Sequence, residues 1–182
     1  QEIWGLELFE GKAMCSACHP SEWEEGEPLP LFTDFTFDNL GTPKNPENPF
    51  YKMDKVYLDD GTAINPDGSE WIDKGLGGFL ETRPEYAAMA EENMGKHKVP
   101  TLRNVGKKNG NGFVKAYMHN GVFKSLKEVV HFYNTRDVEM WPEPEVAENV
   151  NDDELGNLGL TDAEEDAIVA FMMTLSDGYI KK

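Results

Sequence analysis

The stretch that decides the fold is Cys15-Ser16-Ala17-Cys18-His19, which has the C-x-x-C-H spacing of c-type haem attachment. In this arrangement both cysteine sulfurs form thioethers with the haem vinyl groups, and the histidine coordinates the iron from one side. Two intervening residues let a single turn of chain reach both vinyl carbons. The motif therefore predicts one covalently bound haem c, held by Cys15, Cys18 and His19.

Two other uses of paired cysteines fit the sequence less well. A redox C-x-x-C pair is typical of a βαβ pattern, which the surrounding residues do not show. A structural zinc site would need two more ligands, which only the other histidines could add: His97, His119 and His131. Haem attachment is therefore the preferred interpretation. Because it consumes both cysteines, we expect no disulfide.

The composition is that of an acidic protein. Of 182 residues, 34 are Asp or Glu and 17 are Lys or Arg, which gives a net charge of −17. Such a chain repels phosphate, so we expect no nucleic-acid partner. No apolar run approaches the length of a membrane-spanning helix, so we expect no membrane span.

The compartment is predicted from the haem motif. Covalent haem attachment is ordinarily completed outside the cytoplasm, so we expect a periplasmic or extracellular protein. The first residues, 1–11, lack the basic start and apolar stretch of a signal peptide. We therefore expect that the signal peptide has already been removed.

Helical spacing and capping motifs predict a mainly α fold. Apolar residues recur at helical intervals over 2–14, ahead of the haem motif. Three capping boxes, each a Ser or Thr followed three residues later by Glu, start at Thr82, Ser125 and Thr161. The first of these predicts a helix over about 83–93. Together they indicate a cytochrome c-like helical haem domain with long irregular loops.

Proline and glycine interrupt the chain repeatedly between residues 20 and 80, which predicts irregular structure there. Within this region, the stretch 57–64 has an Asp60-Gly61 turn signal and is expected to form one short hairpin. A second, acidic and proline-containing segment lies at about 137–158. It is typical of a surface linker, with an interaction strap as the alternative.

The residue types leave the sixth coordination position of the iron open. The candidates are sulfur from one of eight methionines, imidazole from a further histidine, phenolate from a tyrosine, or no protein ligand. Methionine raises the reduction potential and suits electron transfer, whereas tyrosinate stabilises ferric iron. An open position permits peroxide or another small ligand to bind. Composition does not choose among these options.

Five parts of the chain match the motifs of a known family in order and rough spacing. They are Leu8 to Lys12, Phe32 to Asp34 with Phe37 to Gly41, Val99 to Asn104, Ala116 to Gly121, and Leu126 to Val130. This pattern resembles the C-terminal haem domain of the bacterial di-haem cytochrome c peroxidase and MauG family. The resemblance covers most of the chain outside about 42–95, which we interpret as a loop-rich insertion. The whole chain, 1–182, is predicted to form a single c-type cytochrome domain.

The resemblance implies a role in redox chemistry. In that family peroxide reacts at the N-terminal haem, and this sequence resembles the electron-transferring half. We therefore expect a single-haem cytochrome that acts in periplasmic or extracellular electron transfer. The alternative is a haem peroxidase-like enzyme whose sixth iron ligand is open or displaceable. The acidic surface would suit a redox protein partner with a basic docking surface.

The resemblance also implies a sixth iron ligand. Tyr133 falls where the peroxidases have a ligating methionine and where MauG has a tyrosine. The same tyrosine could instead be a core residue with its hydroxyl hydrogen-bonded. Met118 and Met94 are the alternative ligands, and a vacant site is the remaining option.

Two further predictions concern groups around the haem. Arg103 lies between apolar Leu102 and Val105 in a basic stretch, so we expect its guanidinium to bind a haem propionate, with a solvated surface stretch as the alternative. Calcium binding is implied by the family, whose calcium ion is held by loop carbonyls. The matching positions in this chain are Val114 and Ala116.

Overall fold

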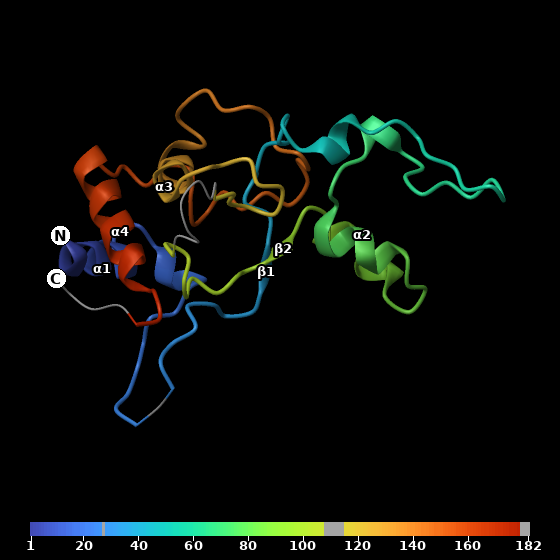
Figure 1. Cartoon of the computed structure of the whole chain (residues 1–182). Coiled ribbons are helices and arrows are strands. Elements are labelled where there is room, and N and C mark those ends of the chain that lie inside the picture. The colour runs from blue at the N-terminus through green and yellow to red at the C-terminus, as the bar shows by residue number, and fades with distance from the viewer. Residues whose placement is uncertain (27, 108–114, 179–182) are drawn as a thin grey trace.

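The computed structural model describes residues 1–26, 28–107 and 115–178 (Figure 1). Its α-helices are α1 (Glu2–Glu10), α2 (Gly75–Glu81), α3 (Leu126–Thr135) and α4 (Asp162–Thr174). Its 3-10 helices are η1 (Cys15–Ala17), η2 (Pro49–Lys52), η3 (Gly68–Glu70), η4 (Ala87–Met89) and η5 (Glu91–Asn93). Two short strands, β1 (Phe37–Asp38) and β2 (His97–Lys98), pair antiparallel. Among the described residues, no helix is both long and apolar enough to cross a membrane.

The apolar core lies between α1 and α4, with α3 packed beside α4. Phe9 on α1 is 1% exposed, and its ring meets that of Phe171 on α4 edge-on at 5.2 Å. A Cβ at Gly5 would lie 1.9 Å from the Ala167 carbonyl oxygen, so the missing side chain lets the two helices approach closely. Full burial of a Phe-sized side chain contributes roughly 1.5–3 kcal/mol. This core therefore supports the turn that carries the haem motif.

Capping boxes start α3 and α4, as the sequence predicted. The Ser125 hydroxyl accepts a hydrogen bond from the Glu128 backbone N–H at 3.1 Å, and the Glu128 carboxylate accepts one from the Ser125 N–H at 2.8 Å. The same reciprocal pair joins Thr161 and Glu164 at the start of α4. These contacts satisfy backbone donors that a helix start otherwise leaves unpaired.

The helix predicted over 83–93 is wrong. Thr82 instead follows the end of α2, and its hydroxyl donates to the Phe79 carbonyl oxygen at 2.7 Å. The residues after it form the two short turns η4 and η5. A Cβ at Gly77 would lie 2.6 Å from the Met94 backbone nitrogen, so α2 packs directly on the end of η5. This tertiary contact outweighs the local capping signal.

The first predicted helix ends earlier than expected. It was predicted over 2–14, whereas α1 ends at Glu10 and the next turn leads into η1. Gly11 follows the helix end, and Met14 has a left-handed φ of 53°. The chain therefore changes direction immediately before Cys15.

Residues 42–95, which we call the arm, extend to one side of the molecule, away from α1 and α4 (Figure 1). The predicted hairpin is present near its tip, where Tyr57 and Ala63 form an antiparallel bridge. The Leu58 N–H donates to the Thr62 carbonyl oxygen at 2.8 Å, and Gly61 has φ +83° in the turn. That positive φ explains the glycine of the Asp60-Gly61 signal.

The acidic segment at 137–158 contacts both the helical body and the arm. The ring of Trp141 packs edge-on against Phe132 of α3 at 5.2 Å, and its indole N–H donates to the Thr135 hydroxyl. Further along, Pro144 forms an antiparallel bridge with Pro43 of the arm. The segment thus connects two parts of the molecule.

Candidate functional site

The two cysteines of the motif lie on one tight turn that begins with η1. The His19 backbone N–H donates to the Cys15 carbonyl oxygen at 3.0 Å, which closes the turn around both thiols. Burial raises the pKa of Cys15 to about 12. Burial, followed by the charge of Glu154, raises the pKa of Cys18 to about 11. Both cysteines are free thiols rather than a disulfide, so both sulfurs remain for thioether bonds.

The imidazole of His19 is held by a hydrogen bond to the backbone. Its Nδ1 lies 2.7 Å from the carbonyl oxygen of Phe32, which can only accept a hydrogen bond. Nδ1 therefore carries the proton, and Nε2 keeps its lone pair for a metal. Burial also lowers the pKa of His19, which favours the neutral ring. The residues of the motif thus fit a c-type haem.

Tyr133 lies on α3 beside the haem motif. Its pKa is raised, first by burial and then by the charges of Cys15, Cys18 and Asp38. The residue is partly exposed. Its position beside both cysteines makes this hydroxyl available to a group bound at the motif.

The alternative sulfur ligands lie on other parts of the chain. Met118 belongs to the turn that precedes α3 and has φ +66°. Met94 follows η5 in the arm, and its carbonyl oxygen accepts a hydrogen bond from the Asn149 side chain at 3.2 Å. Iron ligation by Met118 or Met94 therefore remains a prediction.

Arg103 has a protein partner that sequence analysis did not identify. Its guanidinium forms an ion pair with the Asp177 carboxylate, and the side-chain N–H of Asn104 donates to the same carboxylate at 3.0 Å. These hydrogen bonds lower the pKa of Asp177. The predicted propionate contact would have to share the guanidinium with Asp177. For the predicted calcium site, Val114 lies outside the described residues and Ala116 lies within them.

Two carboxylates lie close to Cys18. The amide N–H group of Asn151 donates to Asp38 at 2.5 Å and to Glu154 at 2.7 Å. One ligand-type atom from each of Cys18, Asp38 and Glu154 lies within 4.8 Å of the others. These residues are far apart in sequence, so no motif could have identified them. Their negative charge would favour the oxidised state of a haem attached here.

A buried carboxylate, Glu145, joins the acidic segment to the arm. Its side chain is 1% exposed and accepts hydrogen bonds from the Tyr51 hydroxyl at 2.8 Å and the Asp73 backbone N–H at 2.9 Å. The Asn120 amide donates to it at 3.1 Å, and His119 Nε2 lies 3.2 Å away. Although burial alone would raise its pKa, these donors hold the pKa of Glu145 down at about 2. Glu145 is therefore ionised, and its carboxylate connects the acidic segment to Tyr51 and Asp73 of the arm.

Comparison with known proteins identifies relatives that cover nearly the whole chain. No family model matches. The cytochrome c peroxidase IdrP1 of Denitromonas iodatirespirans is 32% identical over 175 residues, which is 94% of this chain and 39% of the relative. The methylamine utilization protein MauG of Paracoccus denitrificans is 33% identical over 176 residues, 90% of this chain and 39% of the relative. The chain thus spans about two fifths of the length of each.

Solved structures show the same relationship. The di-haem peroxidase BthA from Burkholderia thailandensis superposes with a TM-score of 0.67 at 27% identity, covering 98% of this chain and 43% of BthA. A MauG-like protein associated with microbial copper homeostasis shares the fold, with a TM-score of 0.55 at 23% identity. The resemblance seen in the sequence motifs is therefore confirmed. Over nearly its whole length, the chain is a relative of the di-haem cytochrome c peroxidase and MauG family.

Proposed function

We propose that this chain is a single-haem c-type cytochrome domain that acts in periplasmic or extracellular electron transfer. Cys15 and Cys18 would bind the haem covalently, and His19 would coordinate its iron. The observation that carries this proposal is the 2.7 Å contact between His19 Nδ1 and the Phe32 carbonyl oxygen, which leaves Nε2 for the metal. The cytochrome c peroxidase and MauG relatives support the assignment of a haem protein.

Tyr133 is the sixth ligand that we propose. By the resemblance it falls at the family's ligand position, and in the structure it lies beside the two cysteines. The bound haem would supply a one-electron redox centre. The protein would fix the His19 ring and exclude water from the buried side. A tyrosinate on the iron would favour the ferric state.

The partner that we propose is a redox protein with a basic docking surface. The net charge of −17 would attract such a partner at long range and speed the first encounter. Salt screens charges over about 8 Å at physiological ionic strength, so the electron-transfer rate should fall as salt is added. A rate that does not change with salt would contradict this docking mode.

The experiment begins with protein produced in a periplasm that contains the haem-attachment machinery. Intact-mass spectrometry should show one added haem, and Cys15→Ser with Cys18→Ser should abolish covalent attachment. Absorption and low-temperature EPR spectra of the ferric protein should then carry tyrosinate features. Tyr133→Phe should remove these features.

Tyr117→Phe is the matched control for the spectra. Tyr117 is a partly buried tyrosine whose hydroxyl donates to the Val105 carbonyl oxygen at 3.1 Å. Its replacement should leave the spectra unchanged. Identical spectra for Tyr133→Phe and the unmodified protein would remove Tyr133 as a ligand. A native mass without haem would overturn the whole proposal.

A haem peroxidase-like enzyme is the second candidate, because the curated relatives include cytochrome c peroxidases. This function would require an open or displaceable sixth position. Steady-state assays with hydrogen peroxide and a reduced electron donor distinguish the two candidates. An electron-transfer domain should undergo reversible one-electron reduction and consume peroxide only at the background rate. Peroxide turnover well above background would favour the enzyme.

A further inference from the structure

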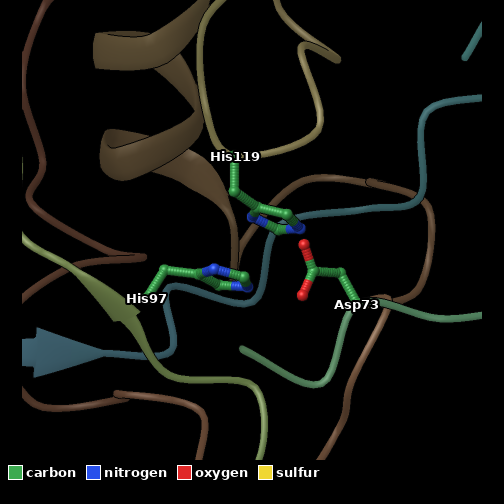
Figure 2. A group of neighbouring side chains, drawn as sticks. All are labelled: Asp73, His97 and His119. Atoms are coloured by element: carbon green, nitrogen blue, oxygen red, sulfur yellow. The ribbon is translucent and has the colours of Figure 1, made fainter. Parts of the chain in front are cut away.

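Two histidines and an aspartate meet where the arm joins the body, apart from the haem motif. Asp73 precedes α2, His97 lies in β2, and His119 lies in the turn before α3 (Figure 2). One ligand-type atom from each residue lies within 4.8 Å of the other two. Figure 2 shows the Asp73 carboxylate facing the edges of both imidazole rings. We propose that these three side chains bind a divalent transition-metal ion.

The donor set determines the class of metal. Imidazole nitrogen with a single carboxylate suits Zn²⁺, Cu²⁺ or Ni²⁺, whereas Ca²⁺ and Mg²⁺ prefer oxygen ligands alone. Three protein ligands would leave at least one coordination position for water. The proposed ion is therefore of the zinc and copper class, and it is distinct from the calcium that the family's loop carbonyls would hold.

The surrounding charges favour a cation. Asp73 lies beside the ionised Glu145, whose carboxylate is 3.2 Å from His119 Nε2. Two carboxylates thus lie beside imidazole nitrogens, and a divalent ion would compensate the charge of the carboxylates.

The proposed ligands keep side-chain atoms that are not hydrogen-bonded, and the backbone around them is held in place. Within the described residues, the His97 ring makes no hydrogen bond; it only stacks on another ring. One Asp73 oxygen accepts the Gly75 backbone N–H at 3.0 Å, which orients the carboxylate. The pairing of His97 with Asp38 fixes β2. Metal binding therefore requires movement of side chains alone.

The movement required is a tilt of the two rings. His97 and His119 stack at 3.7 Å with an interplanar angle of 7°. Nitrogen lone pairs lie in the ring planes, so those of parallel rings do not converge on one ion. Zinc binds imidazole nitrogen at about 2.0–2.1 Å, and the rings would have to open toward Asp73 to reach that distance. Binding would exchange the stacking contact for two metal bonds.

The test uses the haem-loaded protein and Zn²⁺ as the probe. Equilibrium dialysis followed by elemental analysis gives zinc per chain, while iron per chain reports haem loading separately. We expect saturable uptake of one zinc per chain. His97→Gln and Asp73→Asn should each weaken zinc binding by at least about 10-fold, the size of effect seen even for outer-shell residues. Excess Ca²⁺ should not displace the zinc.

His131→Gln is the matched control. His131 is also a partly exposed histidine beside carboxylates, with Nδ1 2.9 Å from Glu165 and Nε2 3.3 Å from Glu139. Its replacement should leave zinc affinity unchanged. Absence of saturable uptake by the unmodified protein would overturn the proposal, as would equal uptake by His97→Gln and Asp73→Asn. Because iron is measured separately, failure of the zinc site and failure of haem attachment are distinguishable.

Discussion

The helical body and the arm are held together by different interactions. In the body, α1, α3 and α4 bury apolar side chains, and Phe9, Phe132 and Ile168 are at most 1% exposed. In the arm, several buried groups are polar and hydrogen-bonded, such as Asn45 and Asn65. Apolar packing depends on shape and volume, whereas a buried hydrogen bond depends on one particular partner. The two regions should therefore respond to different substitutions.

Asparagine side chains make many of the polar contacts of the arm. Asn45 donates to the Asn120 carbonyl oxygen at 2.9 Å, and Asn120 donates to the Pro43 carbonyl oxygen at 2.8 Å. Nearer the tip, Asn65 donates to the Asp54 carbonyl oxygen at 2.6 Å and accepts from the Val56 N–H at 2.5 Å. These amides serve backbone groups that irregular loops would otherwise leave unpaired. They replace the hydrogen bonds that helices and sheets provide elsewhere.

The largest effect is expected from a cavity in the body. Phe9→Ala removes a ring that contacts both Phe32 and Phe171, and should lower the free energy of unfolding by about 3–5 kcal/mol. Urea titration followed by circular dichroism measures this change. Phe79→Ala in the arm is the control, because that side chain is 52% exposed and should cost far less. Equal losses would show that the apolar core does not dominate stability.

A smaller effect, confined to the arm, is expected from Glu145→Gln. The amide has the shape of the carboxylate but lacks the negative charge to which the four neighbouring groups hydrogen-bond. The loss of this charge should lower the free energy of unfolding of the arm by about 1.5–3 kcal/mol. Amide hydrogen exchange should accelerate around Tyr51 and Asp73, while α1 and α4 should stay protected. Acceleration spread evenly over the chain would contradict the separation of the two regions.

The same carboxylate predicts a dependence on pH. The pKa of Glu145 is lowered from 4.5 to about 2, so the ionised form stabilises the folded arm. This contribution is present above pH 4.5 and is lost as the pH falls toward 2. Arm exchange rates in the unmodified protein should rise across that interval. In Glu145→Gln the corresponding rise should be smaller.

The smallest effect of the series is expected from Gly77→Ala, compared with Gly78→Ala. A Cβ at Gly77 would lie 2.6 Å from the Met94 backbone nitrogen, whereas one at Gly78 would lie 2.8 Å from the Lys74 Cβ, at the start of the same helix. Overpacking against the backbone should cost about 1–3 kcal/mol for Gly77→Ala. Alanine favours helix over glycine, and this preference offsets part of the Lys74 contact, so Gly78→Ala should cost less than Gly77→Ala. Thermal unfolding and hydrogen exchange of α2 measure the effect of each substitution. Equal destabilisation by Gly77→Ala and Gly78→Ala would rule out the close packing of Gly77 on Met94.

The parts of the fold predicted from sequence are those specified by neighbouring residues. The capping boxes at Ser125 and Thr161 are correct because both partners of each box lie within one turn. The box at Thr82 fails because the preceding residues form a helix of their own. That helix, α2, was missed because three of its seven residues are glycines, which disfavour helix in isolation. Its packing on η5 is a tertiary contact that local patterns do not contain.

The candidate sites divide in the same way. Cys15, Cys18 and His19 could be identified because their chemistry needs a fixed local spacing. The Asp177 partner of Arg103 lies 74 residues away, and no spacing rule relates the two. Asp73, His97 and His119 likewise come from separate segments. Only the folded chain shows that they meet.

The position of Glu145 along the chain sets an order of events in folding. Residues of the arm are made before it, yet Tyr51 and Asp73 complete their hydrogen bonds only with its carboxylate. During synthesis from the N-terminus, the arm therefore emerges well ahead of the residue that secures it. Contacts across 72 and 94 positions also close slowly, because long loops lose entropy when their ends meet. The arm should consequently become fully ordered only after residue 145 has been made.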